Sequence, residues 1–387
     1  MRPQAQDGML RDMTSNRIGL SAAGRKLLSS LKVPREPSEL AESGVTAEVL
    51  GMMQAHGLIE TQDKTRPPLD LFEAFNGWKS QRGMLVDHVR TASFQKAIQA
   101  VVRPGDRIID VGTGSGVLAM LAARAGAVEA VGLEVTEMAE WADRIARANG
   151  LDAVRIVKGD ASSYMAPEPV DVVMGEFIGM SFLEEWRHYA AFVQVRDRNL
   201  KPGGTVIPRA ARLLLSAVDS RKLYYERGYG FWEAPAYGID FSAVRASEIS
   251  SPQRYIVSAD HNAIVCTREV ANFDFLAGTE HDYFFSTTAE FLYPAAGSFH
   301  GFIGHFELDL MPGLVLGTGP AARETHWHQS YFPMPAIQVP AGGRILARIR
   351  TFLSPSDDRI CIGITVAGRD EDLEVYREAQ EAVFVLE

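Results

Sequence analysis

A short apolar segment that runs through a glycine-rich turn into a second apolar segment constrains this chain most strongly. Residues 108–121 read IIDVGTGSGVLAML. IIDV has the character of a buried strand and VLAML begins a helical pattern, so the glycines stand at a strand-to-helix turn. Glycine lets the backbone turn tightly and approach a ligand without a clashing Cβ atom. The segment therefore predicts one strand–turn–helix unit of an α/β fold, with a ligand at the turn.

The pattern of predicted helices and strands changes near residue 210. Before it, RIIDVG, AVGLEV, VRIVKGD and VDVVMGE read as strands, and helical stretches such as EMAEWADRIARANG lie among them. This alternation predicts a doubly wound, Rossmann-like parallel sheet in residues 67–208. After it, strand-like segments such as AIVCTREV and FHGFIGHFELDL follow one another with few helical patterns. Residues 209–387 are therefore predicted to form an antiparallel β-barrel or sandwich.

Residues 1–66 stand apart from this pattern. Three short helical stretches and the hydrophobic edge GLIE resemble a winged-helix module, and TQDKTRPPLD reads as a linker. Such modules bind DNA, bind leader peptides or dimerise. The module carries nine basic and eight acidic side chains, so its near-neutral charge disfavours DNA.

The bulk composition excludes several classes of function. The chain has 387 residues and a net charge of −10, which argues against nucleic acid as a partner and suits a cationic substrate. No apolar run has the length of a membrane span, and the N-terminus lacks the apolar core of a signal peptide. Cys266 and Cys361 do not suggest a disulfide framework. We expect a cytoplasmic protein with no membrane partner and no metal site.

The glycine turn has the features of a nucleoside site. Gly112, Gly114 and Gly116 are spaced G-x-G-x-G, and Val117 stands where a dinucleotide fingerprint needs glycine. Glu134 ends the next strand, where it can accept hydrogen bonds from a ribose diol, and Asp110 precedes the turn. This combination is similar to the class I S-adenosylmethionine-dependent methyltransferases, which implies S-adenosyl-L-methionine as the cofactor.

Two carboxylates bracket an apolar loop just past a strand. In VMGEFIGMSFLEEW, residues 173–186, Glu176 follows the strand and Glu185 stands near the next helix. Because ligands bind at the carboxyl edge of such sheets, Glu176 should face the reactive end of the cofactor. Two carboxylates can fix the plane of a guanidinium and leave one of its nitrogens free to react. The alternative is compensation of the helix dipole in solvent, which we favour for Glu184.

These residues resemble the protein arginine methyltransferase family. The family's double-glutamate loop stands here as Glu176-Phe177-Ile178-Gly179, closing at Glu185, and its Thr-His-Trp motif as Thr325-His326-Trp327. MLVDHVRTASFQKAI, residues 84–98, resembles the family segment before the first strand. The likeness runs from about residue 70 to the end of the chain.

The resemblance implies roles around the cofactor. Arg90 would meet the cofactor's carboxylate, and Phe72 would stack over the site. Met84 would shape the pocket, and Ala161 and Ser162 would lie beside the adenine.

It also implies catalytic and substrate contacts. Asp87 and His326 would pair near Glu185 and hold the site together or help to carry away a proton. Trp327 would contact the substrate. A dimerisation arm, residues 232–244, would make the protein a homodimer.

The sequence departs from the family at several positions. Leu71 and Phe75 stand where tyrosines are expected, and Gln81 replaces a histidine. Arg187 stands two residues after Glu185, at a position where the family often has an apolar pocket residue. A cation beside a guanidinium is unfavourable unless it serves an anion, and free arginine carries an α-carboxylate. An exposed surface role for Arg187 is the alternative.

Three functions are compatible with these residues. The first, which we favour because of Arg187, is an arginine N-methyltransferase acting on free arginine or another small guanidino compound. The second is the same reaction on arginine in a peptide or protein, with residues 1–66 as the peptide reader. The third is a binding protein that keeps the fold without catalysis.

Overall fold

The structure is a computed structural model that describes residues 9–11, 17–19, 76–179, 183–245, 249–257, 263–354, 359–369 and 377–386. The chain divides into two units, Met1–Pro68 with Leu353–Asp358, and Leu69–Phe352 with Arg359–Glu387. In the first unit, β1 (Met9–Arg11) and β2 (Arg17–Gly19) form an antiparallel pair. The predicted winged-helix helices, the linker and Phe72 lie outside the described residues.

The second unit begins with the predicted Rossmann-like sheet, which is confirmed. Its parallel strands are β3 (Arg107–Val111), β4 (Glu129–Glu134), β5 (Val154–Lys158), β6 (Val170–Gly175) and β7 (Leu200–Ile207). Their spatial order is β5-β4-β3-β6-β7. The chain moves outward from β3 to β5 and then returns to β6 beside β3. The carboxyl ends of β3 and β6 therefore form the topological switch point, which is where ligands bind in such sheets.

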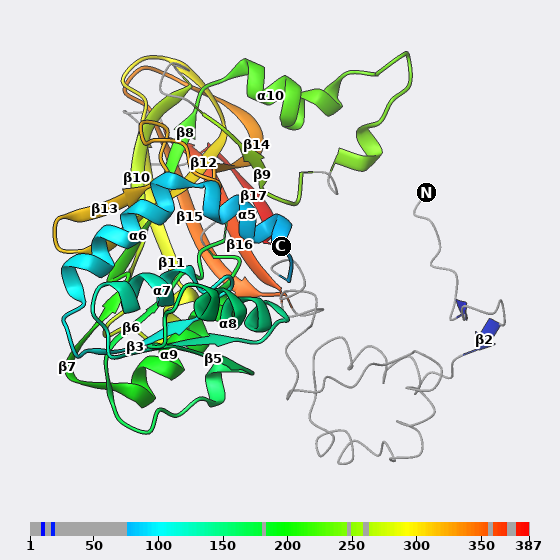
Figure 1. Cartoon of the computed structure of the whole chain (residues 1–387). Coiled ribbons are helices and arrows are strands. Elements are labelled where there is room, and N and C mark those ends of the chain that lie inside the picture. Colours follow the sequence, from blue (N-terminus) through cyan, green and yellow to red (C-terminus); the bar gives the residue numbers. More distant parts are fainter. Residues whose placement is uncertain are drawn as a thin grey trace, which may run out of the picture. The chain divides into compact units, whose positions relative to one another are not determined.

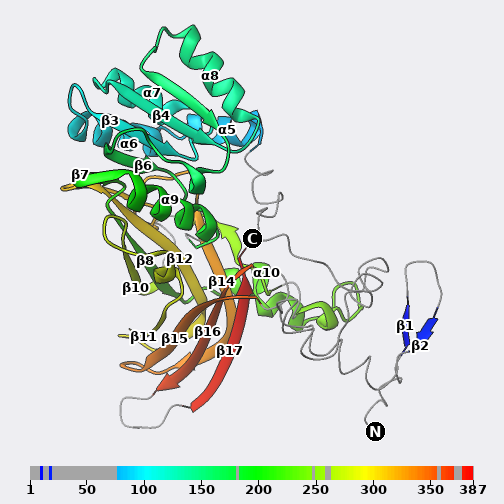
Figure 2. The same ribbon diagram turned by 90° about the horizontal axis from the view of Figure 1, so that it is seen from below.

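Helices cover both faces of this sheet. They are α7 (Val117–Arg124), α8 (Met138–Ala148) and α9 (Trp186–Asn199). α7 and α8 lie over one face and α9 over the other, as right-handed crossovers require (Figure 2). The short η1 (Ala161–Ser163) follows β5.

Two helices precede the sheet, α5 (Trp78–Val86) and α6 (His88–Val101). α6 buries Phe94, Ala97 and Ile98 completely. It packs against α7 and β7 of the parallel sheet and also against the antiparallel strands that follow (Figure 1). Residues on α6 can therefore link the two halves of the unit.

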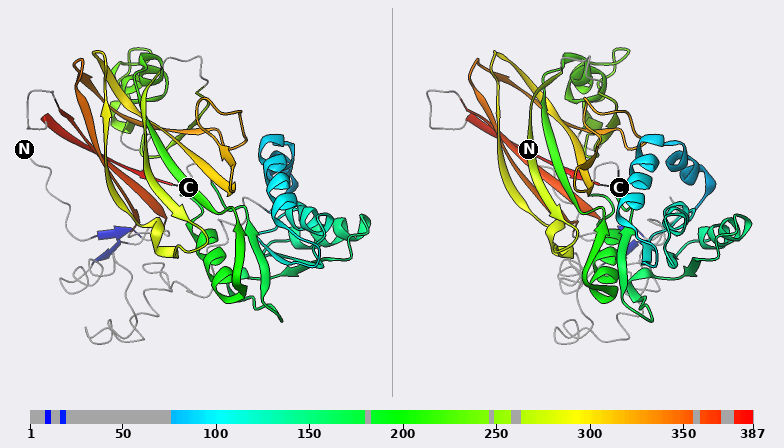
Figure 3. Two further views of the ribbon diagram at one scale, coloured as in Figure 1. Left: turned by 90° about the vertical axis from the view of Figure 1, so that its left-hand side faces the viewer. Right: turned by 60° about the vertical axis from the view of Figure 1, so that its left-hand side comes forward.

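The antiparallel domain predicted after residue 208 is also confirmed. One sheet has the order β10-β8-β12-β14-β9, with β13 beside β12, and the other the order β11-β15-β16-β17. β10 lies against β11, and β14 against β16 and β17, so the two sheets enclose one core (Figure 3). The strands are β8 (Ala210–Val218), β9 (Gln253–Tyr255), β10 (Ile264–Asp274), β11 (Ser286–Leu292), β12 (Gly297–Met311), β13 (Leu314–Gly317), β14 (Gln329–Val339), β15 (Arg344–Leu353), β16 (Ile360–Arg369) and β17 (Arg377–Val385).

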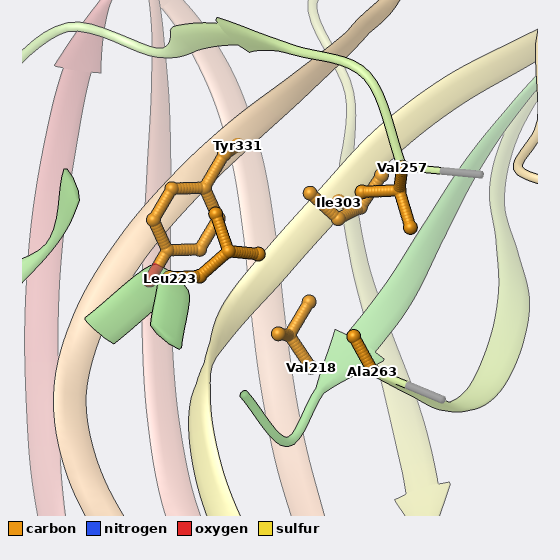
Figure 4. Packing of buried hydrophobic residues seen from close by; sticks show 6 residues of the cluster. All are labelled: Val218, Leu223, Val257, Ala263, Ile303 and Tyr331. Carbon is orange, nitrogen blue, oxygen red and sulfur yellow. The ribbon is translucent and has the colours of Figure 1, made fainter. Parts of the chain in front are cut away.

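A helical excursion leaves the barrel after β8. It comprises α10 (Arg221–Arg227), η2 (Tyr229–Glu233) and η3 (Ser242–Val244), and it contains the predicted arm (Figure 1). Leu223 of α10 packs into a buried cluster of the barrel, which fixes the base of the excursion (Figure 4). The members of the cluster are Val218, Leu223, Val257, Ala263, Ile303 and Tyr331.

A further short helix, η4 (Glu280–Tyr283), precedes β11. Two other features bear on the cellular location that the sequence predicts. Cys266 and Cys361 are both free thiols. Within the described residues, no helix is long and apolar enough to cross a membrane. The cytoplasmic location stays a prediction.

Candidate active site

The glycine turn between β3 and α7 has the backbone conformation that glycine favours. Gly112, Gly114 and Gly116 have φ values of 68°, 53° and 81°, a region that side chains with a Cβ rarely adopt. A Cβ added at Gly112 would meet open space. The turn therefore presents backbone, without side chains, at the switch point of the sheet.

Gln81 of α5 closes over this turn. Its side-chain oxygen Oε1 accepts a hydrogen bond of 3.0 Å from the backbone N–H of Ser115, and the residue is buried. A Cβ on Gly114 would come within 2.8 Å of the same oxygen. The glutamine that replaces the expected histidine thus holds α5 against the turn.

Glu134 stands beside the turn, as its place at the end of β4 predicts. Its oxygen Oε2 accepts a hydrogen bond of 2.8 Å from the N–H of Gly114, and Oε1 accepts one of 2.9 Å from the N–H of Thr136. Each carboxylate oxygen has a second lone pair. Glu134 can therefore order the turn and still accept hydrogen bonds from two ribose hydroxyls.

Asp110 lies at the end of β3 and is 1% exposed. Its oxygen Oδ2 accepts hydrogen bonds from the Thr113 hydroxyl and the Ala119 N–H, and its Oδ1 has no hydrogen-bond partner among the described residues. Burial raises the pKa of Asp110 to about 7, although the bonds from Thr113 and Ala119 oppose the change. Whether this buried carboxyl is protonated or ionised therefore sets the charge beside the turn.

Glu176, just past β6, is clamped by Arg90 of α6. Arg90 donates from Nε and Nη2 to Glu176 Oε2, at 3.0 and 2.7 Å, and both side chains are 6% exposed. The other oxygen, Oε1, accepts a hydrogen bond of 2.9 Å from the N–H of Ile178. A buried carboxylate needs such partners, and they fix the direction in which Glu176 points. The contact of Arg90 with the cofactor's carboxylate stays a prediction.

Glu185 occupies the N-cap position of α9 and is 9% exposed. Its oxygen Oε2 lies 2.9 Å from His188 Nδ1. Burial alone would lower the pKa of His188, but the carboxylates of Glu185, Glu134 and Glu176 outweigh it and raise that pKa. The charges of Glu176, of Glu185 and of Glu134, the predicted partner of the ribose, therefore all act on one half-buried imidazole.

The Thr-His-Trp segment joins the barrel to this site at two points. Asp87 Oδ2 accepts hydrogen bonds of 2.8 Å from the backbone N–H and from Nδ1 of His326. The indole N–H of Trp327 donates to the backbone carbonyl of Ile178 at 2.6 Å. Trp327 is buried and supports the loop that carries Glu176; its direct contact with a substrate stays a prediction.

Two family models match the two halves of this unit. The model described as ribosomal protein L11 methyltransferase matches residues 87–207, and that of the arginine methyltransferase oligomerization subdomain matches residues 209–363. The chain is 31% identical over 279 residues to Protein arginine N-methyltransferase 1.1 of Arabidopsis thaliana, covering 70% of each chain. It is 31% identical over 270 residues to Protein arginine N-methyltransferase 1 of Schizosaccharomyces pombe, covering 67% of this chain and 78% of the relative.

This chain belongs to the protein arginine N-methyltransferase family. Solved structures show the same fold. The Trypanosoma brucei PRMT1 enzyme–prozyme complex with AdoHcy has a TM-score of 0.73 at 23% identity, covering 80% of this chain and 99% of that one. Arabidopsis thaliana protein arginine methyltransferase 10, in an open conformation, has a TM-score of 0.72 at 24% identity, covering 82% and 100%.

An arginine N-methyltransferase of this family takes S-adenosyl-L-methionine as its cofactor, which supplies a methyl group on a positively charged sulfur. The residues present fit this group. The bare backbone at Gly112 leaves room for a ligand at the turn, and Glu134 has spare acceptor capacity beside it. The carboxylates near His188 give the site the negative charge that a sulfonium and a guanidinium both favour.

Other predicted residues lie on α5 and on η1. Met84 lies on α5 and is half-buried, and its carbonyl accepts a hydrogen bond of 3.1 Å from the Thr91 hydroxyl. Ala161 and Ser162 begin η1, where the Ser162 N–H donates to Asp160 Oδ1 at 2.8 Å. The adenine and pocket contacts of these residues stay predictions.

Arg187 is half-buried on the first turn of α9, with its guanidinium carbon 5.0 Å from the centre of the Trp186 ring. Stacking on an aromatic face is a favourable environment for a guanidinium. Arg187 can therefore stand beside the double-glutamate loop for a structural reason.

The sequence predicted no role for two neighbours of the site: Gln81, noted only as the replacement of a histidine, and His188. The i, i+3 spacing from Glu185 places His188 on the same side of α9, so the second could have been found from the sequence. Gln81 gave no such signal, because it meets Ser115 only after α5 folds over the glycine turn.

Proposed function

We propose that this arginine N-methyltransferase acts on arginine residues in a peptide or protein. Arginine methylation follows from family membership, and the finer question is the acceptor. The relatives at about 30% identity are named as protein arginine N-methyltransferases. These names favour arginine in a peptide or protein, the second of the three functions above, over free arginine, which is the first.

One observation supports the chemistry of the site: the side chains of Glu176 and Glu185 are only 6% and 12% exposed, and both carboxylates raise the pKa of His188. Two fixed carboxylates can hold a guanidinium in one plane and orient one terminal nitrogen toward the methyl donor. That nitrogen would form a bond to the methyl carbon as the bond between this carbon and the sulfur of the donor breaks, which leaves a neutral thioether, and the methylated nitrogen would then lose a proton. The pair of His326 and Asp87, joined by a bond of 2.8 Å, can carry that proton away or hold α6 in place.

The free-arginine expectation rested on Arg187 as the partner of an α-carboxylate. Its stacking on Trp186 gives it a place without that anion. A peptide acceptor has no α-carboxylate at its arginine, so it does not require Arg187 as the partner of such a group.

A methyl-transfer assay with labelled S-adenosylmethionine tests this proposal. We expect label in arginine of peptides, and kcat/KM for free arginine and for agmatine lower by about 10²-fold or more, since remote binding contacts are lost. Amino-acid analysis of the hydrolysed peptide identifies methylated arginine. Equal kcat/KM for free arginine and peptide would restore the first reading, and Arg187→Met then measures the contribution of that side chain.

We also propose a homodimer that forms through the arm. The match to an oligomerization subdomain includes this segment. Apolar arm residues are strongly exposed, at 102% for Tyr237, 59% for Ile239 and 42% for Phe241. The hydroxyl of Tyr224 donates to Glu233 Oε1 at 2.6 Å and so fixes the start of the arm. Apolar surface presented in this way is typical of a protein interface.

A charge placed in the arm should dissociate such a dimer. We expect light scattering to give twice the chain mass for the wild type and the monomer mass for Ile239→Glu, since a carboxylate resists burial in an apolar interface. The matched control is Val315→Glu on β13, another exposed aliphatic residue, which should remain dimeric. A monomeric wild type, or an unaffected Ile239→Glu variant, would contradict the proposal.

A further inference from the structure

Outside the roles assigned above, a half-buried titratable side chain lies against the double-glutamate loop. His188 lies one turn into α9, and its Nδ1 is 2.9 Å from Glu185 Oε2. Its side chain is 18% exposed and that of Glu185 is 12% exposed. The imidazole therefore engages one oxygen of a carboxylate that the acceptor guanidinium also needs.

The surroundings of His188 are rich in charge. Carboxylates face it from the start of its own helix, from β4 and from the loop after β6, and a clamped guanidinium stands behind the last of these. Burial would lower the pKa of His188, but the carboxylates outweigh burial and raise it. The groups are Glu185, Glu134 and Glu176, with Arg90 paired to Glu176, Arg187 on the same turn as His188, and Tyr283 of η4 facing Glu185.

We propose that His188 is a positioning residue for Glu185, and that its protonation state sets how strongly the loop holds the acceptor guanidinium. The proposal rests on the proposed function, in which Glu176 and Glu185 bind that guanidinium. It concerns a side chain that takes no part in the methyl transfer and acts through Glu185.

The physical reason is competition for one negative charge. A protonated His188 pairs with Glu185, so the pair is neutral and attracts a guanidinium weakly. With its proton on Nδ1, a neutral His188 can donate to Glu185 over the 2.9 Å contact and hold it in place, while the carboxylate keeps its full charge for the acceptor. By linkage, acceptor binding must weaken proton binding at His188 by the same factor.

The first experiment measures the pair without any need for turnover. The pKa of His188 is followed by NMR of the full-length protein labelled at histidine, with the signal assigned by its absence from His188→Asn. We expect a value above the ordinary 6.5, and a lower value in Glu185→Gln. An unchanged His188 pKa in Glu185→Gln would overturn the proposal, whatever the activity.

The second experiment measures the acceptor KM against pH at saturating cofactor, with an arginine peptide. For the wild type we expect KM to fall by about fivefold or more as pH rises through the pKa of His188, the lower end of usual site couplings. His188→Asn, whose amide can replace the Nδ1 donor, should show the low KM already at acid pH, with kcat close to that of the wild type. His188→Leu, which removes the donor, should lower kcat at every pH.

The matched control is His281→Gln, an exposed histidine on η4, which should keep the wild-type pH profile. A wild-type profile in His188→Asn would overturn the inference while leaving the proposed function intact. No methylation by the wild type at any pH would refute the proposed function, and the NMR comparison would still decide whether His188 and Glu185 are coupled.

Discussion

Glu176→Gln is expected to lower kcat/KM for an arginine acceptor by about 10²–10³-fold, the usual cost of removing one preorganised charge from an active site. Under the proposed function, the amide removes a charge that binds the acceptor guanidinium. It also leaves the guanidinium of Arg90, which is 6% exposed, without the counter-charge that accepts from its Nε and Nη2. Both consequences act at the loop that must orient the reacting nitrogen.

Initial rates with a labelled cofactor measure this loss, and calorimetry separates it from cofactor binding. We expect cofactor affinity to change by only a few-fold, because the hydrogen bonds of Glu134 to the turn are unaffected. The matched control is Glu184→Gln, a carboxylate in the same segment that is outside the predicted pair. Equal losses in Glu176→Gln and Glu184→Gln would mean that the loop as a whole, and not the pair, carries the activity.

Asp87→Asn is expected to lower kcat by about 10²-fold, within the range of acid–base and proton-carrying groups. Asp87 accepts three hydrogen bonds, from the Arg90 N–H and from the backbone N–H and Nδ1 of His326. An amide has one oxygen, so at least one of these donors loses its acceptor. The free energy of unfolding should fall by about 1–3 kcal/mol, the cost of a buried donor left unpaired.

The effect of Asp87 should depend on pH. Burial alone would raise its pKa, but the bonds from His326 and Arg90 outweigh burial and hold the pKa below its ordinary value of 3.8. Stability from a lowered pKa is present above that ordinary value and is lost as pH falls through the folded-state pKa. Urea unfolding at neutral and at strongly acidic pH should therefore show a difference between wild type and Asp87→Asn that shrinks in acid.

A nearby carboxylate provides the comparison for Asp87. Glu324 stands just before the Thr-His-Trp segment, and its side chain is 64% exposed. Glu324→Gln should leave both kcat and stability unchanged. Wild-type kcat in Asp87→Asn would mean that the link between α6 and the barrel has no part in catalysis.

Strands with a clean pattern could be predicted, and strands interrupted by proline could not. β14 contains Pro333 and Pro335, which argue against a strand. β9 pairs with it only at residues 329–331, so beyond Tyr331 the missing N–H groups of these prolines break no bond to β9. β7 likewise contains Pro202, Gly203 and Gly204, yet its apolar end at Val206 and Ile207 pairs with β6.

Some contacts of the site residues follow from local sequence pattern, and others do not. Asp110, Glu134 and Glu176 each stand at the carboxyl end of a parallel strand, and the ends of such strands meet at one edge of the sheet. Their meeting therefore follows from local pattern. The bond from Asp87 to His326 and that from Trp327 to Ile178 join residues far apart in the chain, and no local pattern contains them; only the family resemblance anticipated the first.

The sequence by itself determined the parallel sheet, the antiparallel barrel, the glycine turn and the two loop glutamates, because hydrophobic periodicity and glycine geometry are local properties of the chain. Tertiary structure alone decided the partners of those groups. Arg90 meets Glu176, Gln81 meets Ser115, and His188 meets Glu185 inside a cluster of carboxylates. The physical reason is that a buried charge or polar group must find its partner among whatever side chains packing brings near, and packing is a property of the whole unit.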